Sequence, residues 1–317
     1  MTTLNAKVVN DNSNCSPIAA VERNIDGVDS CFDSKTIQEV AEQLNLADVL
    51  VPVEEVTVPA NKLGFSEVVS GVIAVNKISR ANALEKLKNA VGCGNSDGDT
   101  CIISKVPDSV MVADRIFKPE GTRNATDWLS NHNIDKVLKQ YEDLSNHLKN
   151  FGKFLHLNYH MVDFMDPPPR YSYPLTGKQI YDVVLNDPEK YNCFGTVLNT
   201  DVSTGKGQHW FAMFGDFRNT AEHTIEIYNC AGGQMDIKLE EWGTKQAAHM
   251  YSKTKIPCKF INVSLGTAHQ RDTYSCGIYS IYYIIKRLEK HPYLEFSKAG
   301  SINDKMIHDF RNKIFHK

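Results

Sequence analysis

The stretch AHQRDTYSCGIYSIYYIIKRL (residues 268–288) leads from a polar loop directly into an apolar helix, and Cys276 stands in the first turn of that helix. A cysteine at a helix N-terminus lies near the positive end of the helix dipole and near free backbone N–H groups, which stabilise a thiolate. Gly277 permits the close approach of a substrate backbone. The pattern predicts that Cys276 is a nucleophile; the alternative is an inert core cysteine.

Three other residues supply the groups that a thiol nucleophile requires. Gln270, six residues upstream, carries an amide that can donate to a developing oxyanion. His209 opens the strand-like run HWFAMF, which would hold it firmly enough to act as a base. Asn229 closes the next run, TIEIYN, where adjacent strand ends can place it beside His209 to orient the imidazole. The rival histidines, His223 and His269, are predicted to be surface or loop residues.

The apolar runs around these residues predict the fold class. Strand-like and helical patterns alternate along this part of the chain, and the run at His209 is apolar on both faces, as in a central strand. The sequence therefore predicts an α+β fold with helices flanking a central mixed sheet. Predicted strands cover 194–198, 209–214, 224–228 and 259–263; predicted helices cover 133–150, a short segment from 176, 238–252, 276–289 and 302–315.

A turn-rich segment, KPEGTRN at 118–124, marks the predicted domain boundary because it presents no apolar face. We expect a smaller N-terminal arm domain at 1–124 and a core domain, which carries the candidate cysteine site, at 125–317.

Within the predicted arm domain, Ser34 and Ser79 are expected to cap helices. The β-branched runs at 51–58 and 68–75 predict strands. Residues 1–33 are rich in Asn, Asp and Ser and are expected to be poorly ordered.

Composition excludes few functions. The chain has 317 residues, 42% of them hydrophobic, and a formal net charge of -3. This overall composition and charge give no indication of binding to nucleic acid, a membrane surface or an acidic substrate. The region from Lys253 onward holds twelve Lys or Arg against five Asp or Glu, which a solvated face explains better than a nucleic-acid site. The N-terminus lacks the blocks of a signal peptide, and no run has the apolar length of a membrane span, so we expect a non-secreted protein.

The eight cysteines show no CxxC pairs and no dense spacing, so they are predicted to be reduced thiols in a cytosolic compartment. The stretch CGNSDGDTC (93–101) is compatible with a metal or redox loop. A flexible turn with two unrelated thiols is the favoured interpretation, since no zinc ligand set is complete.

The order of the candidate residues resembles the ubiquitin-like-protein protease clan, which includes SUMO proteases and the adenovirus protease. The shared pattern is His-Trp, then an Asn or Asp about twenty residues on, then Gln-x5-Cys-Gly opening a helix. Within the clan the chain is most similar to the polyprotein-processing cysteine proteases of African swine fever virus and other large DNA viruses. The resemblance extends from about Cys93 to the C-terminus, and its carrying segments are TRNATDWLSNHNID (122–135), FGTVLNTDVSTGKGQHWFAMFGDFRN (194–219), IEIYNCAG (225–232) and HQRDTYSCGIYSIYYIIKRL (269–288).

The resemblance implies the fold of that clan, with a papain-like core, and a role for each matching residue. Cys276 would be the nucleophile, His209 the base, Asn229 the third triad member and Gln270 the oxyanion donor. Trp210 would line a narrow substrate channel, and Asn199 would lie on the substrate side. Cellular SUMO proteases have Asp in place of Asn229, so the chain agrees with the viral branch. A neutral Asn stabilises an imidazolium less than a carboxylate does, so the thiolate is expected to depend more on the helix terminus.

The resemblance also implies the substrate, which would be a peptide bond after Gly-Gly in a viral structural polyprotein, cleaved during virion maturation. No metal or organic cofactor, no membrane and no nucleic acid is expected to be required. The expected location is the host cytoplasm, at virus assembly sites, and the virion.

Three alternatives stay open at this point. A deconjugating protease for ubiquitin-like modifiers would use the same residues and the same Gly-Gly preference. A catalytically silent module would bind Gly-Gly tails without cutting them. A nucleic-acid-binding protein would use the basic C-terminal region, whose surplus is seven charges, and would bind with a steep salt dependence.

Overall fold

The computed structural model describes residues 14–46, 49, 53–58, 71–76, 79–94, 96–149, 152–166, 172–187 and 190–316, with 53–58, 71–76 and 147–149 described by their backbone only. The chain divides into two compact units. The first comprises residues 1–121, 147–151 and 314–317, and the second comprises 122–146 and 152–313. Two short later segments therefore belong to the first unit, a feature absent from the predicted division at 124.

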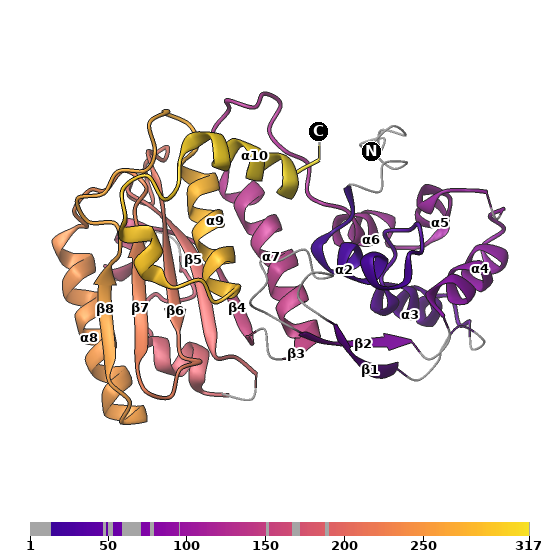
Figure 1. Cartoon of the computed structure of the whole chain (residues 1–317), viewed down its shortest axis with the longest axis horizontal. Helices are drawn as coiled ribbons and strands as arrows, with labels where there is room; N and C mark the ends of the chain where they lie inside the picture. The colour runs from indigo at the N-terminus through magenta and orange to yellow at the C-terminus, as the bar shows by residue number, and fades with distance from the viewer. Residues whose placement is uncertain are drawn as a thin grey trace. The chain divides into compact units, whose positions relative to one another are not determined.

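The second unit is built on a five-stranded sheet in the order β4-β5-β6-β7-β8 (Figure 1). β4 pairs parallel with β5 and β7 pairs parallel with β8, whereas β6 is antiparallel to both of its neighbours, β5 and β7. The predicted α+β fold with a mixed sheet is confirmed. The strand bounds are β4 Phe154–Met161, β5 Cys193–Asn199, β6 Trp210–Asp216, β7 His223–Tyr228 and β8 Cys258–Asn262.

Helices cover both faces of this sheet because successive strand residues point to opposite sides. On β7, Glu226 faces α9 (Cys276–Leu288), whereas Ile225 and Ile227 join the apolar cluster that includes α8 (Ile237–Thr254). Gly195 on β5 allows α9 to lie close, since a Cβ there would be 2.8 Å from Ile284 Cγ2. The other helices of this unit are α7 (Asn131–His147, whose last residue belongs to the first unit), α10 (Asp304–Ile314, whose last residue does likewise), and the short η3 (Val162–Met165), η4 (Tyr181–Leu185) and η5 (Tyr293–Ser297).

A buried ion cluster fastens α9 to the sheet. Glu226 is fully buried and accepts from Arg287 Nε at 2.7 Å and Nη2 at 2.8 Å. The Tyr283 hydroxyl donates to the same carboxylate at 2.6 Å, and Arg287 Nη2 also reaches Asp216 Oδ2 at 3.0 Å. A paired and fully hydrogen-bonded charge of this kind tolerates burial, while loss of one partner does not. The helix that begins at Cys276 is therefore held in a fixed position on β6 and β7.

The first unit combines short helices with a three-stranded antiparallel sheet in the order β1-β2-β3. Its apolar core includes Phe32, Ile37, Leu87 and Ile102. The element bounds are α2 Pro17–Asp26, α3 Ser34–Gln43, β1 Val53–Val58, β2 Gly71–Asn76, α4 Arg80–Ala90, α5 Asp99–Lys105, α6 Ser109–Ile116 and β3 Leu148–Lys149.

Two local predictions for this unit are wrong. Residues 14–33 are not poorly ordered, because α2 begins at Pro17 and its side chains Ile18 and Val21 are buried. Residues 1–13 lie outside the described part of the chain. The cap of α3 is Asp33 rather than Ser34, because the Asp33 carboxylate accepts from the Thr36 N–H at 2.9 Å. Ser79 does cap α4, as predicted.

Two disulfides correct the prediction that all eight cysteines are reduced. Cys15 bonds to Cys31 and Cys93 bonds to Cys101, with Cα–Cα distances of 4.9 Å and 6.0 Å. The CGNSDGDTC stretch therefore joins its two thiols rather than leaving them unrelated. Compact turns bring these pairs together, which residue spacing alone does not reveal.

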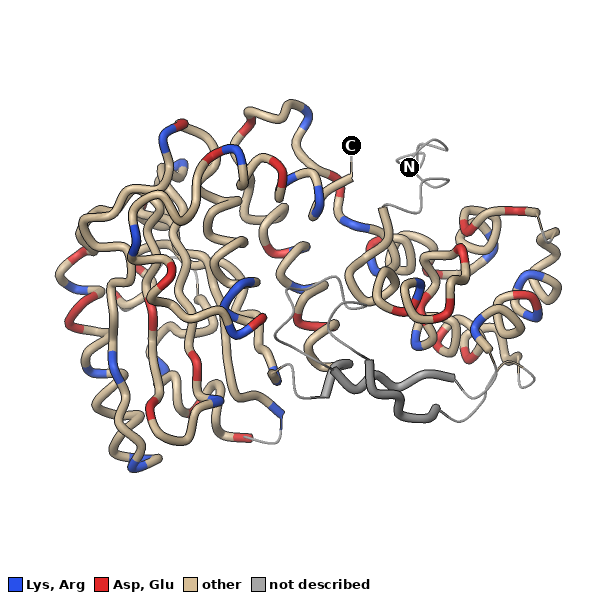
Figure 2. The backbone as a smooth tube through the Cα atoms, viewed as in Figure 1, with Lys and Arg blue, Asp and Glu red and all other residues tan. Residues whose placement is uncertain are grey.

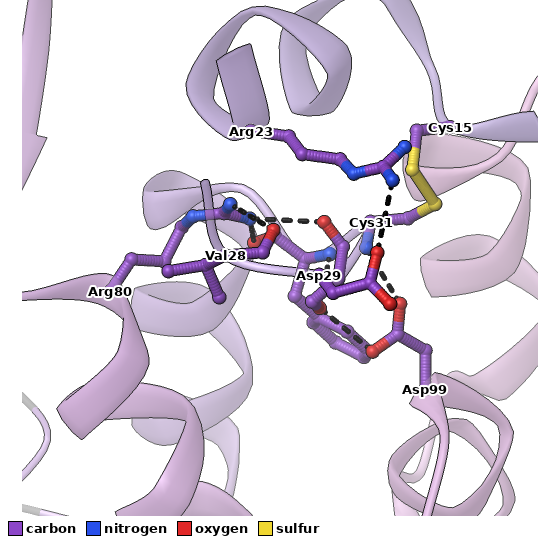
Figure 3. Close-up of a disulfide and its surroundings, with 9 residues drawn as sticks. Cys15, Arg23, Val28, Asp29, Cys31, Arg80 and Asp99 are labelled. Carbon is purple, nitrogen blue, oxygen red and sulfur yellow. Dashed lines mark hydrogen bonds and ion pairs between the residues drawn. A yellow bond between two sulfur atoms is a disulfide. The ribbon is translucent and has the colours of Figure 1, made fainter. Parts of the chain in front are cut away.

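The surroundings of the first disulfide are densely hydrogen-bonded (Figure 3). Asp99 accepts from Ser30 Oγ at 2.7 Å and from the Cys31 N–H at 2.6 Å. Arg80, 4% exposed, binds the Asp26 carboxylate and donates to the Val28 carbonyl at 2.9 Å. The connection between α2 and α3 is thus fixed by a covalent bond and by buried charges.

Charged residues of both signs are interspersed along the described backbone (Figure 2). Within the described ranges, every helix is too short or too polar to cross a bilayer.

Candidate active site

Two strand ends bring the predicted base and its partner together. β6 begins at Trp210, directly after His209, and β7 ends at Tyr228, directly before Asn229. Because β6 and β7 are antiparallel, with Ala212 opposite Tyr228, these two ends lie at the same edge of the sheet. His209 Nε2 lies 2.9 Å from Asn229 Oδ1.

This contact defines which nitrogen of His209 is available for chemistry. Asn229 Oδ1 also accepts from the Ala231 N–H at 3.0 Å, so the oxygen is the end of the amide that faces His209. The imidazole therefore donates through Nε2 and leaves Nδ1 as the basic nitrogen. Ser264, which sequence reasoning missed, holds the Asn229 backbone at both ends: its Oγ accepts from the Asn229 N–H at 2.9 Å and donates to the Asn229 carbonyl at 2.7 Å.

Cys276 opens α9, as predicted, and is 3% exposed. Burial raises the pKa of its thiol above the usual value, while the backbone amides of Trp210 and Gly277 act in the opposite direction without outweighing it. Burial therefore outweighs the stabilisation of the thiolate that the helix terminus was expected to give. A thiol that keeps its proton needs a base at the moment of attack.

Gln270 is held at both ends of its side-chain amide. Its Oε1 accepts from the Cys230 thiol at 3.0 Å, and its Nε2 donates to Asp272 Oδ1 at 3.0 Å. The Gln270 backbone N–H also donates to the Cys230 carbonyl at 3.1 Å. Cys230 follows Asn229 in the chain, so this contact joins the Gln270 loop to the end of β7.

Asp272 organises the loop that precedes α9. Its carboxylate accepts from the Ser275 N–H at 3.0 Å, from Ser275 Oγ at 2.6 Å and from His308 Nε2 at 2.9 Å. Burial alone would raise the pKa of this carboxyl, but hydrogen bonds from Ser275, His308 and Gln270 prevail and lower it to about 2. The position of Asp272 between Gln270 and Cys276 is the one sequence signal that could have identified it.

Contacts link three of the four residues predicted for catalysis, directly or through a neighbour in the sequence. His209 bonds to Asn229, and Cys230, the next residue, bonds to Gln270. The backbone amide of Trp210, the residue after His209, acts to lower the pKa of the Cys276 thiol. All of these residues belong to the second unit.

The predicted substrate-side residues have distinct surroundings. The Trp210 ring is 9% exposed, donates through Nε1 to the Leu129 carbonyl at 3.0 Å and meets Tyr159 edge-on with centroids 6.2 Å apart. Trp210 and Asn199 both line a cavity of about 270 Å³. The other lining residues are Asn131, Tyr159, Met161, Tyr173, Ser203, Gly205, Lys206 and Gly207.

Asn199 and Gly277 also have structural tasks that sequence reasoning did not assign. Asn199 Oδ1 accepts from the N–H groups of Asp201 and Gln208, both at 2.9 Å, so it shapes the loop that leads to His209. A Cβ at Gly277 would lie 3.2 Å from Leu129 Cβ, so the missing side chain allows close packing of α9.

The rival histidines are both buried: His269 lies in a loop, as predicted, whereas His223 opens β7, which corrects its predicted location. His223 and His269 are each 3% exposed. His269 bridges the Tyr228 hydroxyl at 3.1 Å and the Lys298 carbonyl at 3.1 Å, so both of its ring nitrogens have structural partners.

Known proteins similar to this chain are viral thiol proteases. A cysteine protease of African swine fever virus is 31% identical over 252 residues, which cover 73% of this chain and 86% of that protein. A SUMO-1 cysteine protease from another isolate of the virus is 31% identical over 248 residues, covering 72% and 85%. A thiol protease of Acanthamoeba polyphaga mimivirus is 27% identical over 215 residues, covering 68% and 64%.

A solved structure has the same fold over nearly the whole chain. The crystal structure of the African swine fever virus protease aligns with a TM-score of 0.61 at 24% identity and covers 99% of each chain. No protein-family profile matches. The sequence identity, the coverage and the fold agree, and the chain belongs to the family of the African swine fever virus cysteine protease.

Proposed function

We propose that this cysteine peptidase is an endopeptidase in which Cys276 attacks the scissile carbonyl and His209 is the base. The observation that supports it most directly is the His209–Asn229 contact of 2.9 Å, which leaves His209 Nδ1 for chemistry. The Trp210 amide, which acts to lower the pKa of the Cys276 thiol, adds support. Trp210 directly follows His209 in the chain, which supports His209 as the base for Cys276.

The steps follow from these groups. The Cys276 proton moves to His209 Nδ1 as sulfur bonds to the carbonyl carbon, and a Gln270 Nε2–H stabilises the oxyanion. Collapse breaks the C–N bond, the imidazolium gives its proton to the leaving amine, and a thioester remains. His209 then takes a proton from water, the hydroxide attacks the thioester, and the proton returns to sulfur as the acid leaves.

The proposed substrate has Gly-Gly before the scissile bond. The near burial of Trp210, the residue after His209, supports a narrow substrate channel, and glycine is the residue that passes such a channel without a side chain. The cavity lined by Tyr159, Tyr173 and Trp210 would accept an apolar side chain further upstream.

The proposed biological substrate is a viral structural polyprotein, cleaved during virion maturation at assembly sites in the host cytoplasm and in the virion. Family membership supports this choice. The two disulfides favour the particle as the place of action, because a reducing cytosol does not preserve such bonds.

One relative is a SUMO-1 cysteine protease, which supports a second candidate substrate, a ubiquitin-like modifier with a Gly-Gly tail. A comparison of rates distinguishes the two substrates. Faster cleavage of an intact modifier than of a Gly-Gly-X peptide would favour deconjugation.

A panel of Gly-Gly-X peptides, with products identified by mass spectrometry, tests the proposed reaction. Wild type is expected to cut after the second Gly, and Cys276→Ala is expected to leave the peptides intact. Cleavage by Cys276→Ala, or peptide binding by both proteins without cleavage by either, would contradict the proposal.

A further inference from the structure

Cys230 is a fully buried thiol that the proposed reaction does not use. Its Sγ–H donates to Gln270 Oε1 at 3.0 Å, and its carbonyl accepts from the Gln270 N–H at 3.1 Å. Burial raises the pKa of the Cys230 thiol well above the usual value. The thiol therefore keeps its proton and acts toward Gln270 as a donor.

The neighbour at the other end of the amide has the opposite character. Asp272 Oδ1 accepts from Gln270 Nε2 at 3.0 Å, and the pKa of this carboxyl is lowered to about 2, so it is ionised near neutral pH and only accepts. A side-chain amide can rotate by half a turn, which exchanges oxygen and nitrogen. In the rotated form, Gln270 Oε1 would face a carboxylate that has no hydrogen to donate, and Nε2 would face the thiol sulfur, which is a weak acceptor. Cys230 and Asp272 therefore select the same orientation.

We propose that Cys230 is a positioning residue for Gln270: with Asp272 it fixes the orientation of the amide that stabilises the oxyanion. Nε2 carries two hydrogens, and Asp272 takes one, so the other remains for the oxyanion. This inference rests on the proposed function. It adds the group that preorganises the oxyanion donor, on which electrostatic stabilisation of a transition state depends.

The inference predicts that removing the Cys230 thiol lowers kcat and leaves KM nearly unchanged. Removing one neutral hydrogen bond is worth about 1 kcal/mol, so Cys230→Ala is expected to lower kcat by roughly 3- to 10-fold with little change in KM. Cys230→Ser supplies an O–H donor and is expected to restore kcat to within about twofold of wild type.

The experiment measures cleavage of an internally quenched peptide with a central Gly-Gly-Ala site by the full chain. The variants are Cys230→Ala, Cys230→Ser, Gln270→Ala and the double variant Cys230→Ala with Gln270→Ala. Cys193→Ala is the matched control, since Cys193 is also a buried free thiol and its Sγ lies 3.7 Å from the Lys153 carbonyl. Should Cys230→Ala unfold, Cys230→Val compared with Cys230→Ser repeats the test.

The double variant separates a positioning role from a general structural role. If Cys230 acts through Gln270, adding Cys230→Ala to Gln270→Ala lowers kcat no further. The inference would be overturned if Cys230→Ala had the kcat of wild type. It would also be overturned if Cys230→Ala lowered kcat by the same factor in the Gln270→Ala background as in wild type. Failure of the proposed function has a different signature, because wild type would then show no cleavage that Cys276→Ala abolishes.

Discussion

The two units of this protein achieve stability in different ways. The first has helices of 7 to 11 residues and two disulfides. The second has a sheet covered on both faces, a buried ion cluster around Glu226, and four free cysteines, Cys193, Cys230, Cys258 and Cys276. Short helices contribute little stability alone, so cross-links supply what packing does not. The contrast suggests that the second unit can keep its thiols free, one of them for catalysis.

The strongest way to break the second unit is to remove half of its buried ion pair. Glu226→Gln removes the fully buried carboxylate of the two that pair with Arg287 and leaves only Asp216, and loss of a buried partner costs up to about 3–5 kcal/mol. Urea unfolding followed by tryptophan fluorescence measures this. Lys305→Ala is the control, since the Lys305–Asp309 pair is exposed and should contribute little. Equal stability of Glu226→Gln and wild type would show that α9 is held by apolar packing alone.

The corresponding change in the first unit is Cys15→Ser with Cys31→Ser. Opening a loop of this length is expected to cost about 2–4 kcal/mol. Because the site lies within the second unit, kcat on a Gly-Gly-X peptide is expected to stay within about twofold of wild type at 25 °C. Limited proteolysis and peptide cleavage are measured on the same sample. Loss of kcat in a variant that remains folded would show that the two units are coupled.

Changes at Asn229 are expected to have a smaller effect, on kcat, and they test whether Asn229 orients His209 in the second unit. Asn229→Ala removes the acceptor for His209 Nε2–H and is expected to lower kcat by roughly 10- to 100-fold. Asn229→Asp keeps an oxygen acceptor and is expected to retain most of the activity. Steady-state kinetics at fixed pH provide the test, and equal activities of the Ala and Asp variants would contradict it.

The smallest expected effect is the acid dependence of the loop before α9. The pKa of Asp272 is lowered to about 2, so its contribution to folding stability is complete above the ordinary carboxyl pKa of 3.8 and is lost as pH falls toward 2. Asp272→Asn is therefore expected to flatten part of the decline in stability between pH 4 and pH 2. Thermal unfolding across that range checks this, and parallel curves for the two proteins would count against it.

Sequence patterns predicted the second unit better than the first because its strands and helices have strong apolar periods. β4 was missed because its register with β5 shifts between His156 and Tyr159, where Asn158 has a φ of 44°, and this breaks the alternation of the strand. In the first unit, α5 and α6 span only Asp99–Lys105 and Ser109–Ile116, too short for a clear helical period.

In the candidate site, too, sequence patterns identified some residues and missed others. His209, Asn229, Gln270 and Cys276 were identifiable because their residue types and order suit thiol chemistry. Ser264 and Cys230 act through contacts that depend on how loops fold, and no spacing rule reveals such contacts. Only Asp272 had a signal in the sequence, its position between Gln270 and Cys276. The raised pKa of Cys276 depends on burial, which a position at a helix start does not predict.

The most direct test of the central claim is to react the folded chain with a Gly-Gly peptide that ends in a vinyl sulfone and to map the adduct by mass spectrometry. The four free cysteines, Cys193, Cys230, Cys258 and Cys276, provide an internal control. The account predicts one adduct, at Cys276, and its loss in His209→Ala. An adduct at another cysteine, or labelling of Cys276 that does not depend on His209, would contradict it.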